Sequence, residues 1–216
     1  MANQTPSIRP ADEGTLAGVL KTAIGKAMQS LDVMLPVEVV AYDRATNRAT
    51  VKHLVQMVGS DGEKVSRANI ASIRVMQFGN GAFNISLPIK PGDKGWLKAA
   101  DRDISIFQQG LTEGAPNTAR MHSFQDGVFM PDAMGNGDAP AGQGDRVVIG
   151  SNDGGSYMAF DGTGFYFNVG GTEFQLTAAG FQQTGGTMTH DGKNVGSTHT
   201  HGGVDPGSGN TAVPNP

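Results

Sequence analysis

A seven-residue apolar repeat in the glycine-rich C-terminal part of the chain limits the possible folds more than any other feature. Its members are Phe174, Phe181, Met188 and Val195. A period of seven residues is typical of coiled coils, but the many glycines, threonines and phenylalanines in this region disfavour a helix. We therefore predict a stack of short strands, each of which contributes one apolar residue to a central axis.

Such a stack cannot bury its apolar residues within a single chain. A thin ladder of strands leaves them in water, whereas several chains wound around one another share a core. Only 38% of the residues are hydrophobic and 6% are aromatic, which is little for a large monomeric core. The predicted strands cover Tyr157 to Phe160, Gly164 to Val169, Thr172 to Thr177, Gly180 to Gln183 and Thr187 to His190. This pattern predicts an intertwined β-helix built from several copies of the chain.

The N-terminal part predicts one helix followed by a small β-barrel. Between Asp12 and Leu31, apolar residues follow one helical stripe, which packs either on its own domain or on a partner subunit. From there to about residue 107, β-rich runs alternate with short turns and show no βαβ spacing. The predicted strands cover residues 36–42, 48–58, 71–78, 84–87 and 95–100. The pattern favours an antiparallel barrel of the oligonucleotide/oligosaccharide-binding (OB) type, and the fold class is all-β.

Charge and glycine content both change near residue 126. The preceding part carries 14 basic and 11 acidic residues, whereas the part from Asp126 onward carries 2 basic and 9 acidic residues and 21 of the 32 glycines. We predict an arm and helix at 1–33, an OB-fold barrel at 34–125, a linker at 126–150, a β-helix at 151–201 and an apex tail at 202–216. The acidic C-terminal part is a poor binder of polyanions, so we expect no nucleic-acid partner.

The sequence contains no cysteine, which excludes disulfides and thiolate chemistry. The segment from Met1 to Pro6 lacks a basic stretch followed by an apolar run. No window approaches the roughly 18 apolar residues of a membrane span. We therefore expect a soluble protein made without a Sec-type signal.

A pair of histidines near the C-terminus, His199 and His201, is the candidate metal site. In an extended strand this spacing places both imidazoles on one face. One strand supplies only two nitrogens, and no Asp or Glu lies near enough in sequence to complete the coordination shell, so further copies of the strand are the simplest source of ligands. Two copies would suit tetrahedral zinc, and three copies would suit an octahedral ion such as Fe(II), Ni(II) or Co(II).

Two regions of the sequence resemble proteins of contractile phage tails. The run from Thr189 to Val204 resembles the tip of the central spike, where an HxH strand from each of three chains closes the apex around one iron ion. The residues from Pro206 to Pro216 also match those tips. Similarity to the N-terminal barrel of short membrane-puncturing spikes of the phage phi92 tail-spike type is found at residues 34–43, 90–96, 100–104 and 122–128. No lysozyme insertion is visible.

The resemblance implies a homotrimer with an N-terminal helix, an OB-fold barrel and a trimeric intertwined β-helix. It implies one iron ion (Fe²⁺) per trimer, held octahedrally by His199 and His201 of three chains, although six nitrogens would also suit nickel or cobalt. The implied function is that of a virion protein, the central spike at the tip of the tail baseplate of a phage or tail-like particle. Such a spike binds a baseplate hub protein at its N-terminal barrel end, contacts the host outer membrane transiently and punctures it when the sheath contracts.

Two other functions compete with the spike. An HxH pair also occurs in cupin and amidohydrolase metal sites, but after His201 only Asp205 can ionise, and an amidohydrolase carries its pair on an early strand. We therefore expect no enzyme. The non-enzymatic alternative is a receptor- or carbohydrate-binding tail fibre or adhesin tip. It would expose aromatic side chains on the β-helix, whereas Phe165, Phe174 and Phe181 occupy positions expected to face inward.

Overall fold

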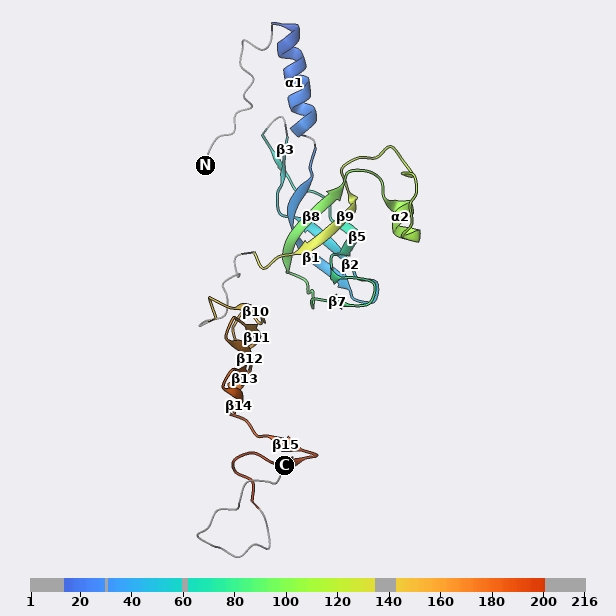
Figure 1. Ribbon diagram of the computed structural model, residues 1–216. Coiled ribbons are helices and arrows are strands. Elements are labelled where there is room, and N and C mark those ends of the chain that lie inside the picture. Colours follow the sequence, from blue (N-terminus) through green and yellow to red (C-terminus); the bar gives the residue numbers. More distant parts are fainter. Residues whose placement is uncertain (1–13, 30, 60–61, 135–142, 201–216) are drawn as a thin grey trace, which may run out of the picture. The chain divides into compact units, whose positions relative to one another are not determined.

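The computed structural model divides the chain into two compact units, Met1–Gly135 and Asn136–Pro216 (Figure 1). It describes residues 14–29, 31–59, 62–134 and 143–200. Strands dominate both units and only two helices occur among the described residues, which is consistent with the predicted all-β class. No helix in these ranges is both long and apolar enough to span a membrane.

Helix α1, Leu16–Gln29, lies within the range that the apolar stripe predicts. It begins after Thr15, whose Oγ1 accepts a hydrogen bond from the N–H of Gly18, a typical N-cap arrangement. Its apolar stripe is exposed in the single chain, at Leu16, Val19, Leu20, Ile24 and Met28. The helix therefore does not obtain its stability from burial within this chain.

The first unit is a closed barrel with the strand order β1-β2-β5-β9-β8. Its strands are β1 Met34–Asp43, β2 Arg48–His53, β5 Ile70–Val75, β8 Lys94–Ala100 and β9 Ser123–Pro131. All neighbours pair antiparallel except β5 and β9, which are parallel. If the five barrel strands are numbered in chain order, their order around the barrel is first, second, third, fifth and fourth. The last barrel strand, β9, therefore lies between β5 and β8.

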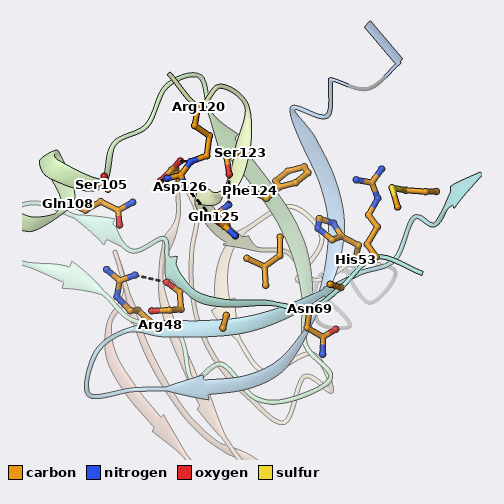
Figure 2. A pocket seen from close by; sticks show the side chains of 16 residues that line it. Arg48, His53, Asn69, Ser105, Gln108, Arg120, Ser123, Phe124, Gln125 and Asp126 are labelled. Carbon is orange, nitrogen blue, oxygen red and sulfur yellow. Dashed lines mark hydrogen bonds and ion pairs between the residues drawn. The ribbon is translucent and has the colours of Figure 1, made fainter. Parts of the chain in front are cut away.

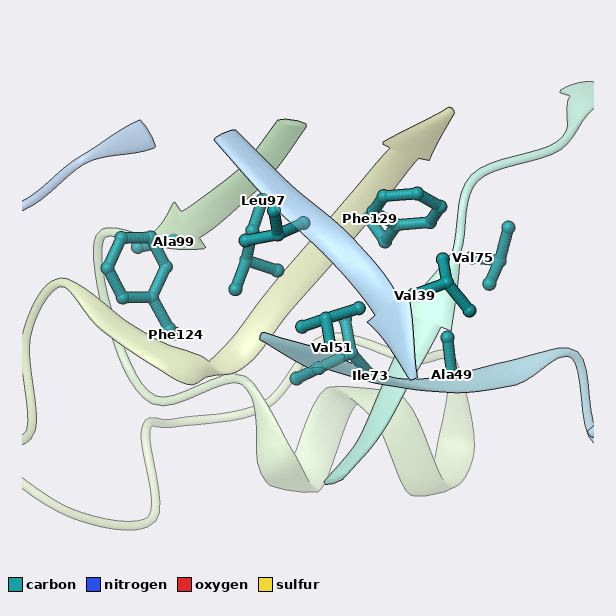
Figure 3. Close-up of a cluster of buried hydrophobic side chains, with 10 residues drawn as sticks. Val39, Ala49, Val51, Ile73, Val75, Leu97, Ala99, Phe124 and Phe129 are labelled. Atoms are coloured by element: carbon teal, nitrogen blue, oxygen red, sulfur yellow. The ribbon is translucent and has the colours of Figure 1, made fainter. Parts of the chain in front are cut away.

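Alternating apolar residues of these strands fill the barrel (Figure 3). In β1, Val37 and Val39 point inward and are almost fully buried, while Glu38 between them does not belong to the core. The core consists of Val37, Val39, Ala49, Val51, Ile73, Val75, Leu97, Ala99, Phe124 and Phe129. Because each barrel strand contributes to this cluster, the first unit has its own hydrophobic core.

Strand β9 differs from the sequence prediction, which assigns residues 126–150 to a linker. Its central Gly127 is required by a close approach of two strands: a Cβ there would lie 2.6 Å from the carbonyl oxygen of Lys98. The barrel therefore extends to Pro131, and the predicted linker also contains strand β10, Val147–Gly150. Gly127 therefore allows two strands to pack closely, although the residues around it resemble those of a flexible segment.

The remaining elements of the first unit are short. Two hairpins and one helix connect the barrel strands: β3 Met57–Val58 with β4 Lys64–Val65, β6 Phe78–Gly79 with β7 Asn84–Ile85, and α2 Ser105–Gly110. The predicted strand at residues 84–87 is thus half of a small hairpin outside the barrel. Trp96, for which an apolar barrel position is expected, is half-buried, and its Nε1–H donates to Asp132 at 2.7 Å.

The second unit contains a five-stranded antiparallel meander and a small hairpin. The meander consists of β10 Val147–Gly150, β11 Ser156–Phe160, β12 Gly164–Val169, β13 Thr172–Thr177 and β14 Gly180–Thr184, and the hairpin of β15 Thr189–His190 and β16 Lys193–Asn194. Two of the predicted strands, 164–169 and 172–177, have the bounds that the sequence predicts. Within one chain these strands form a simple ladder.

Candidate functional site

One face of the meander is apolar across all five strands. Two rows of directly opposed residues cross it. The first row is Val147, Phe160, Phe165, Leu176 and Phe181, and the second is Ile149, Met158, Phe167, Phe174 and Gln183. Nine of these ten side chains are apolar, and we call this surface the apolar face.

The apolar face is exposed in the single chain. The exposed fractions of its nine apolar side chains range from 36% for Phe174 to 60% for Phe181, and ring stacking joins these two at 5.8 Å between centroids. Among the described apolar side chains of the second unit, only Ala159 is buried, and it lies on the opposite face. A contiguous apolar surface of this kind marks an interaction site.

The two rows correct the sequence prediction that each strand contributes one apolar residue. The seven-residue repeat identifies Phe174 and Phe181, which lie in different rows, but it overlooks their neighbours Phe167 and Leu176. Period-two alternation within each strand carries the missing signal, because Phe165, Phe167 and Val169 necessarily share a face. The apolar face is therefore wider than a single axial ladder.

The opposite face of the meander is polar and its side chains bind one another. The Arg146 guanidinium lies 3.6 Å from the centre of the Tyr166 ring, and its Nε donates to Asp161 at 2.9 Å. Gln143 accepts a hydrogen bond from Arg146 and donates one to the hydroxyl of Tyr157. Hydrogen bonds from the Thr163 side chain and backbone, and then from Arg146, hold the pKa of Asp161 well below its usual range. Because the polar side chains already bind one another, the apolar face is the candidate interaction surface of the meander.

The predicted metal ligand His199 follows the β15–β16 hairpin. That hairpin turns at Asp191 and Gly192, both with positive φ, as a two-residue Asp-Gly turn requires. Beyond it, the N–H of His199 donates to the carbonyl of Gly196 at 3.1 Å, and the Nδ1 of His199 lies 2.6 Å from the same oxygen. Because a carbonyl only accepts, Nδ1 carries the proton, and in the neutral ring the lone pair is on Nε2.

The second predicted ligand, His201, lies outside the described residues. The exposed His199 imidazole is chemically suited to a divalent transition metal. Within the described ranges, no group of three or more histidine, aspartate or glutamate side chains is arranged to hold a metal ion. His190 lies in strand β15, with Nδ1 3.7 Å from Asp191.

A buried ion cluster of the barrel was not anticipated from the sequence. Asp103 and Asp126 are 4% and 5% exposed, and Arg120 binds Asp126 through two hydrogen bonds of 2.8 Å (Figure 2). Arg120 also lies 3.5 Å from Asp103. Hydrogen bonds from Ser105 and Thr118 hold the pKa of Asp103 well below its usual range. No local pattern joins these residues, because the long β8–β9 connection brings them together.

The comparison with known families finds a match to the barrel region. Residues 35–132 match the family described as phage protein Gp138 N-terminal domain. The matched range begins at the second residue of β1 and ends one residue after β9. No curated protein matches the chain. The family match supports a structural protein of the phage virion.

Proposed function

We propose that this protein is the homotrimeric central spike of a contractile phage tail, or of a tail-like particle, located at the tip of the baseplate. In this proposal it punctures the host outer membrane when the sheath contracts and performs no enzymatic reaction. The observation that carries the proposal is the apolar face, which extends across the whole meander and which no part of the described chain covers. The family match of the barrel supports the same class of particle.

The barrel is proposed to be an OB fold. Support comes from its strand order and from the parallel pairing of its third and fifth strands, β5 and β9, within an otherwise antiparallel sheet. By the resemblance to phage spikes, this end of the molecule would bind the baseplate hub protein. The exposed apolar stripe of α1 is a second surface that an assembly would cover.

Three copies of the meander would form the shaft of the spike. With their apolar faces turned inward, three sheets enclose a common core and leave the hydrogen-bonded polar faces in water. Two copies would form a sandwich instead. The choice of three rests on the resemblance to phage spikes and on the coordination number that it implies.

The apex of the proposed trimer would hold one metal ion. His199 and His201 of each chain would supply six imidazole nitrogens, a set suited to octahedral Fe²⁺ and also to nickel or cobalt. The contact of His199 Nδ1 with the Gly196 carbonyl fits this role, because metal-binding histidines usually donate their other N–H to an oxygen acceptor. Such an ion would act as a structural clasp at the strand ends, where fraying is easiest.

Mass measurement of the purified protein under non-denaturing conditions, combined with elemental analysis, tests the proposal. We expect three chains and one transition-metal ion per particle. A metal-free monomer would contradict the spike, and binding of that monomer to surface glycans would favour the tail-fibre alternative. Two chains with one zinc ion would retain the metal site but change the architecture. Antibody labelling of intact particles would then show whether the protein is at the baseplate tip.

A further inference from the structure

The barrel has a gap between strands β5 and β9. These two strands pair only at Arg74 with Val128 and at Val75 with Phe129. Strand β5 begins four residues before this pairing, at Ile70, and β9 begins five residues before it, at Ser123. Among the described residues, no backbone hydrogen bond joins these initial segments. Two strand edges therefore face each other without forming a ladder, and we call this gap the β5–β9 slot.

A cavity occupies the β5–β9 slot (Figure 2). It has a volume of about 980 Å³, which is at the upper end of the range for ligand sites. Residues 70–72 of β5 and 123–126 of β9 line it, together with Arg48 and His53 of β2. The close-up places Ser105 and Gln108 of α2 on one side and His53 on the other. The cavity thus extends along the unpaired parts of both strands.

The edge of β5 is distorted at the slot. Ser72 has a φ of +62°, which is uncommon for a residue with a side chain, and the β2–β5 register shifts at this point. The carbonyl oxygen of Ser72 accepts a hydrogen bond from the Arg48 side chain. A side chain thus occupies an acceptor that a neighbouring strand would otherwise use. The bulge therefore lies in the part of β5 that lines the slot.

Three buried polar atoms of the lining residues have no hydrogen-bond partner within the described part of the chain. They are Nδ1 of His53, whose side chain is 7% exposed, Nε of Arg67 and Oγ of Ser105. Burial, and then the charge of Arg67, lower the pKa of His53, so the imidazole is neutral at pH 7. A neutral imidazole and a guanidinium N–H both need partners when they are buried. A polar ligand would satisfy these groups.

We propose that the β5–β9 slot binds an extended acidic peptide segment of another protein as an added β-strand. An extended peptide presents N–H and C=O groups along both of its edges, which matches two facing strand edges. Arginines outnumber aspartates three to one among the lining residues. Arg120 and Arg67 are already paired with aspartates, whereas the hydrogen bond of Arg48 goes to a backbone carbonyl. An acidic side chain of the peptide is therefore expected beside Arg48.

The lining residues favour a peptide over a nucleic acid. Single-stranded nucleic acids bind through aromatic rings that stack on bases. The only aromatic rings among the lining residues are His53 and Phe124, which pack on each other at 4.9 Å. The site therefore lacks the features of an oligonucleotide platform.

Peptide binding to the full-length protein tests the proposal. A displayed library of random short peptides is selected on the protein, and the enriched peptides are synthesised and titrated. We expect acidic peptides that protect the backbone amides of residues 70–72 and 123–126 from hydrogen exchange. Ala71→Trp fills the slot from an exposed position and should weaken binding at least tenfold. Ala82→Trp, at an exposed site away from the slot, is the matched control and should bind normally.

A second variant tests the charge preference. Arg48→Gln should weaken binding of acidic peptides by about 2- to 10-fold while leaving neutral peptides less affected. The proposal is wrong if no peptide is enriched, or if the enriched peptides bind the Ala71→Trp variant as tightly as the original protein. Protection of the same amides by a thymidine oligonucleotide would reassign the slot to nucleic acid. None of these outcomes depends on the number of chains or on metal content, so they are separable from the spike proposal.

Discussion

At the level of single residues, the buried ion cluster explains how a long connection is held on the barrel. Arg120 uses two nitrogens to bind both oxygens of Asp126 in β9, and the same guanidinium approaches Asp103. Both carboxylates are almost inaccessible to water. A lysine could not replace Arg120 here, because an ammonium group does not bind a carboxylate through a planar pair of hydrogen bonds. The β8–β9 connection, including α2, is thus attached at the side of the slot.

The cluster predicts a specific acid sensitivity of the barrel. Hydrogen bonds from Ser105 and Thr118 lower the pKa of Asp103, so its ionised form stabilises the fold above the unfolded-state pKa of about 3.9. This stabilisation is lost as the pH falls below that value toward the lower pKa of the folded state. We expect Asp103→Asn to lower the unfolding temperature at pH 7 and to flatten its decline below about pH 4.

The measurement uses the fluorescence of Trp96, the single tryptophan, which lies in β8 and reports on the barrel unit. The matched control is Asp101→Asn, whose side chain is 84% exposed two positions away. The control should keep the original pH profile. If the profile of Asp103→Asn also stays unchanged, the cluster does not stabilise the barrel through its charge.

At the level of elements, local alternation predicts the strands of the second unit well. Strands β12 and β13 have the predicted bounds, because Phe165, Phe167 and Phe174 alternate with polar residues between glycine-containing turns. Strand β9 was missed because its pairing with β8 and β5 is long-range. In addition, the sequence around its Gly127 has the composition of a loop. The ion cluster was missed for the same reason. In the proposed spike, the metal site of His199 and His201 would need further copies of the chain, which a single sequence does not place.

If the apolar face is an interface, substitutions at its residues, which are exposed in the single chain, should lower stability as much as substitutions in a buried core. Leu176 is 52% exposed in the single chain, and a change at such a position in a monomer is expected to alter stability by less than about 0.5 kcal/mol. If the face is buried in an assembly, Leu176→Gln should cost about 2 kcal/mol per chain. We expect this variant to dissociate at higher protein concentration and to unfold at lower temperature than the original protein.

Dilution followed by native mass measurement detects the dissociation. Gln175→Ala is the matched control. Gln175 is adjacent to Leu176 in the same strand, but its side chain points to the polar face and is not part of either apolar row. The control should remain assembled. Equal behaviour of both variants would show that the apolar face is not the assembly interface.

At the level of the whole molecule, the two units differ in how they obtain stability. The barrel buries ten apolar residues in a core of its own, whereas Ala159 is the one buried apolar residue among those described in the second unit. The barrel is therefore expected to fold as a separate chain, and the meander is expected to fold with its partner copies. In the proposed spike, this division would make the trimer, and not the metal, the main source of stability in the shaft.

That division leads to a prediction about the proposed apex. Replacing both His199 and His201 with alanine should abolish metal binding and leave the trimer largely assembled, because the apolar faces of the meander still associate. Elemental analysis and native mass measurement of the same sample report the two properties separately. His190→Ala is the matched control, since this histidine is 82% exposed in β15 and should not affect metal content.

Metal content and the number of chains per particle together distinguish a metal ion that secures the strand ends, a clasp, from one that is needed for folding, a folding nucleus. A clasp secures strand ends that have already associated, so the metal-free variant should keep three chains and lose protection from hydrogen exchange mainly around residues 189–199. A nucleus would be needed before the strands wind together, and its loss would yield monomers with exposed apolar faces. Complete loss of the trimer in the double variant, with the control still assembled, would therefore assign the ion to folding and overturn its role as a terminal clasp.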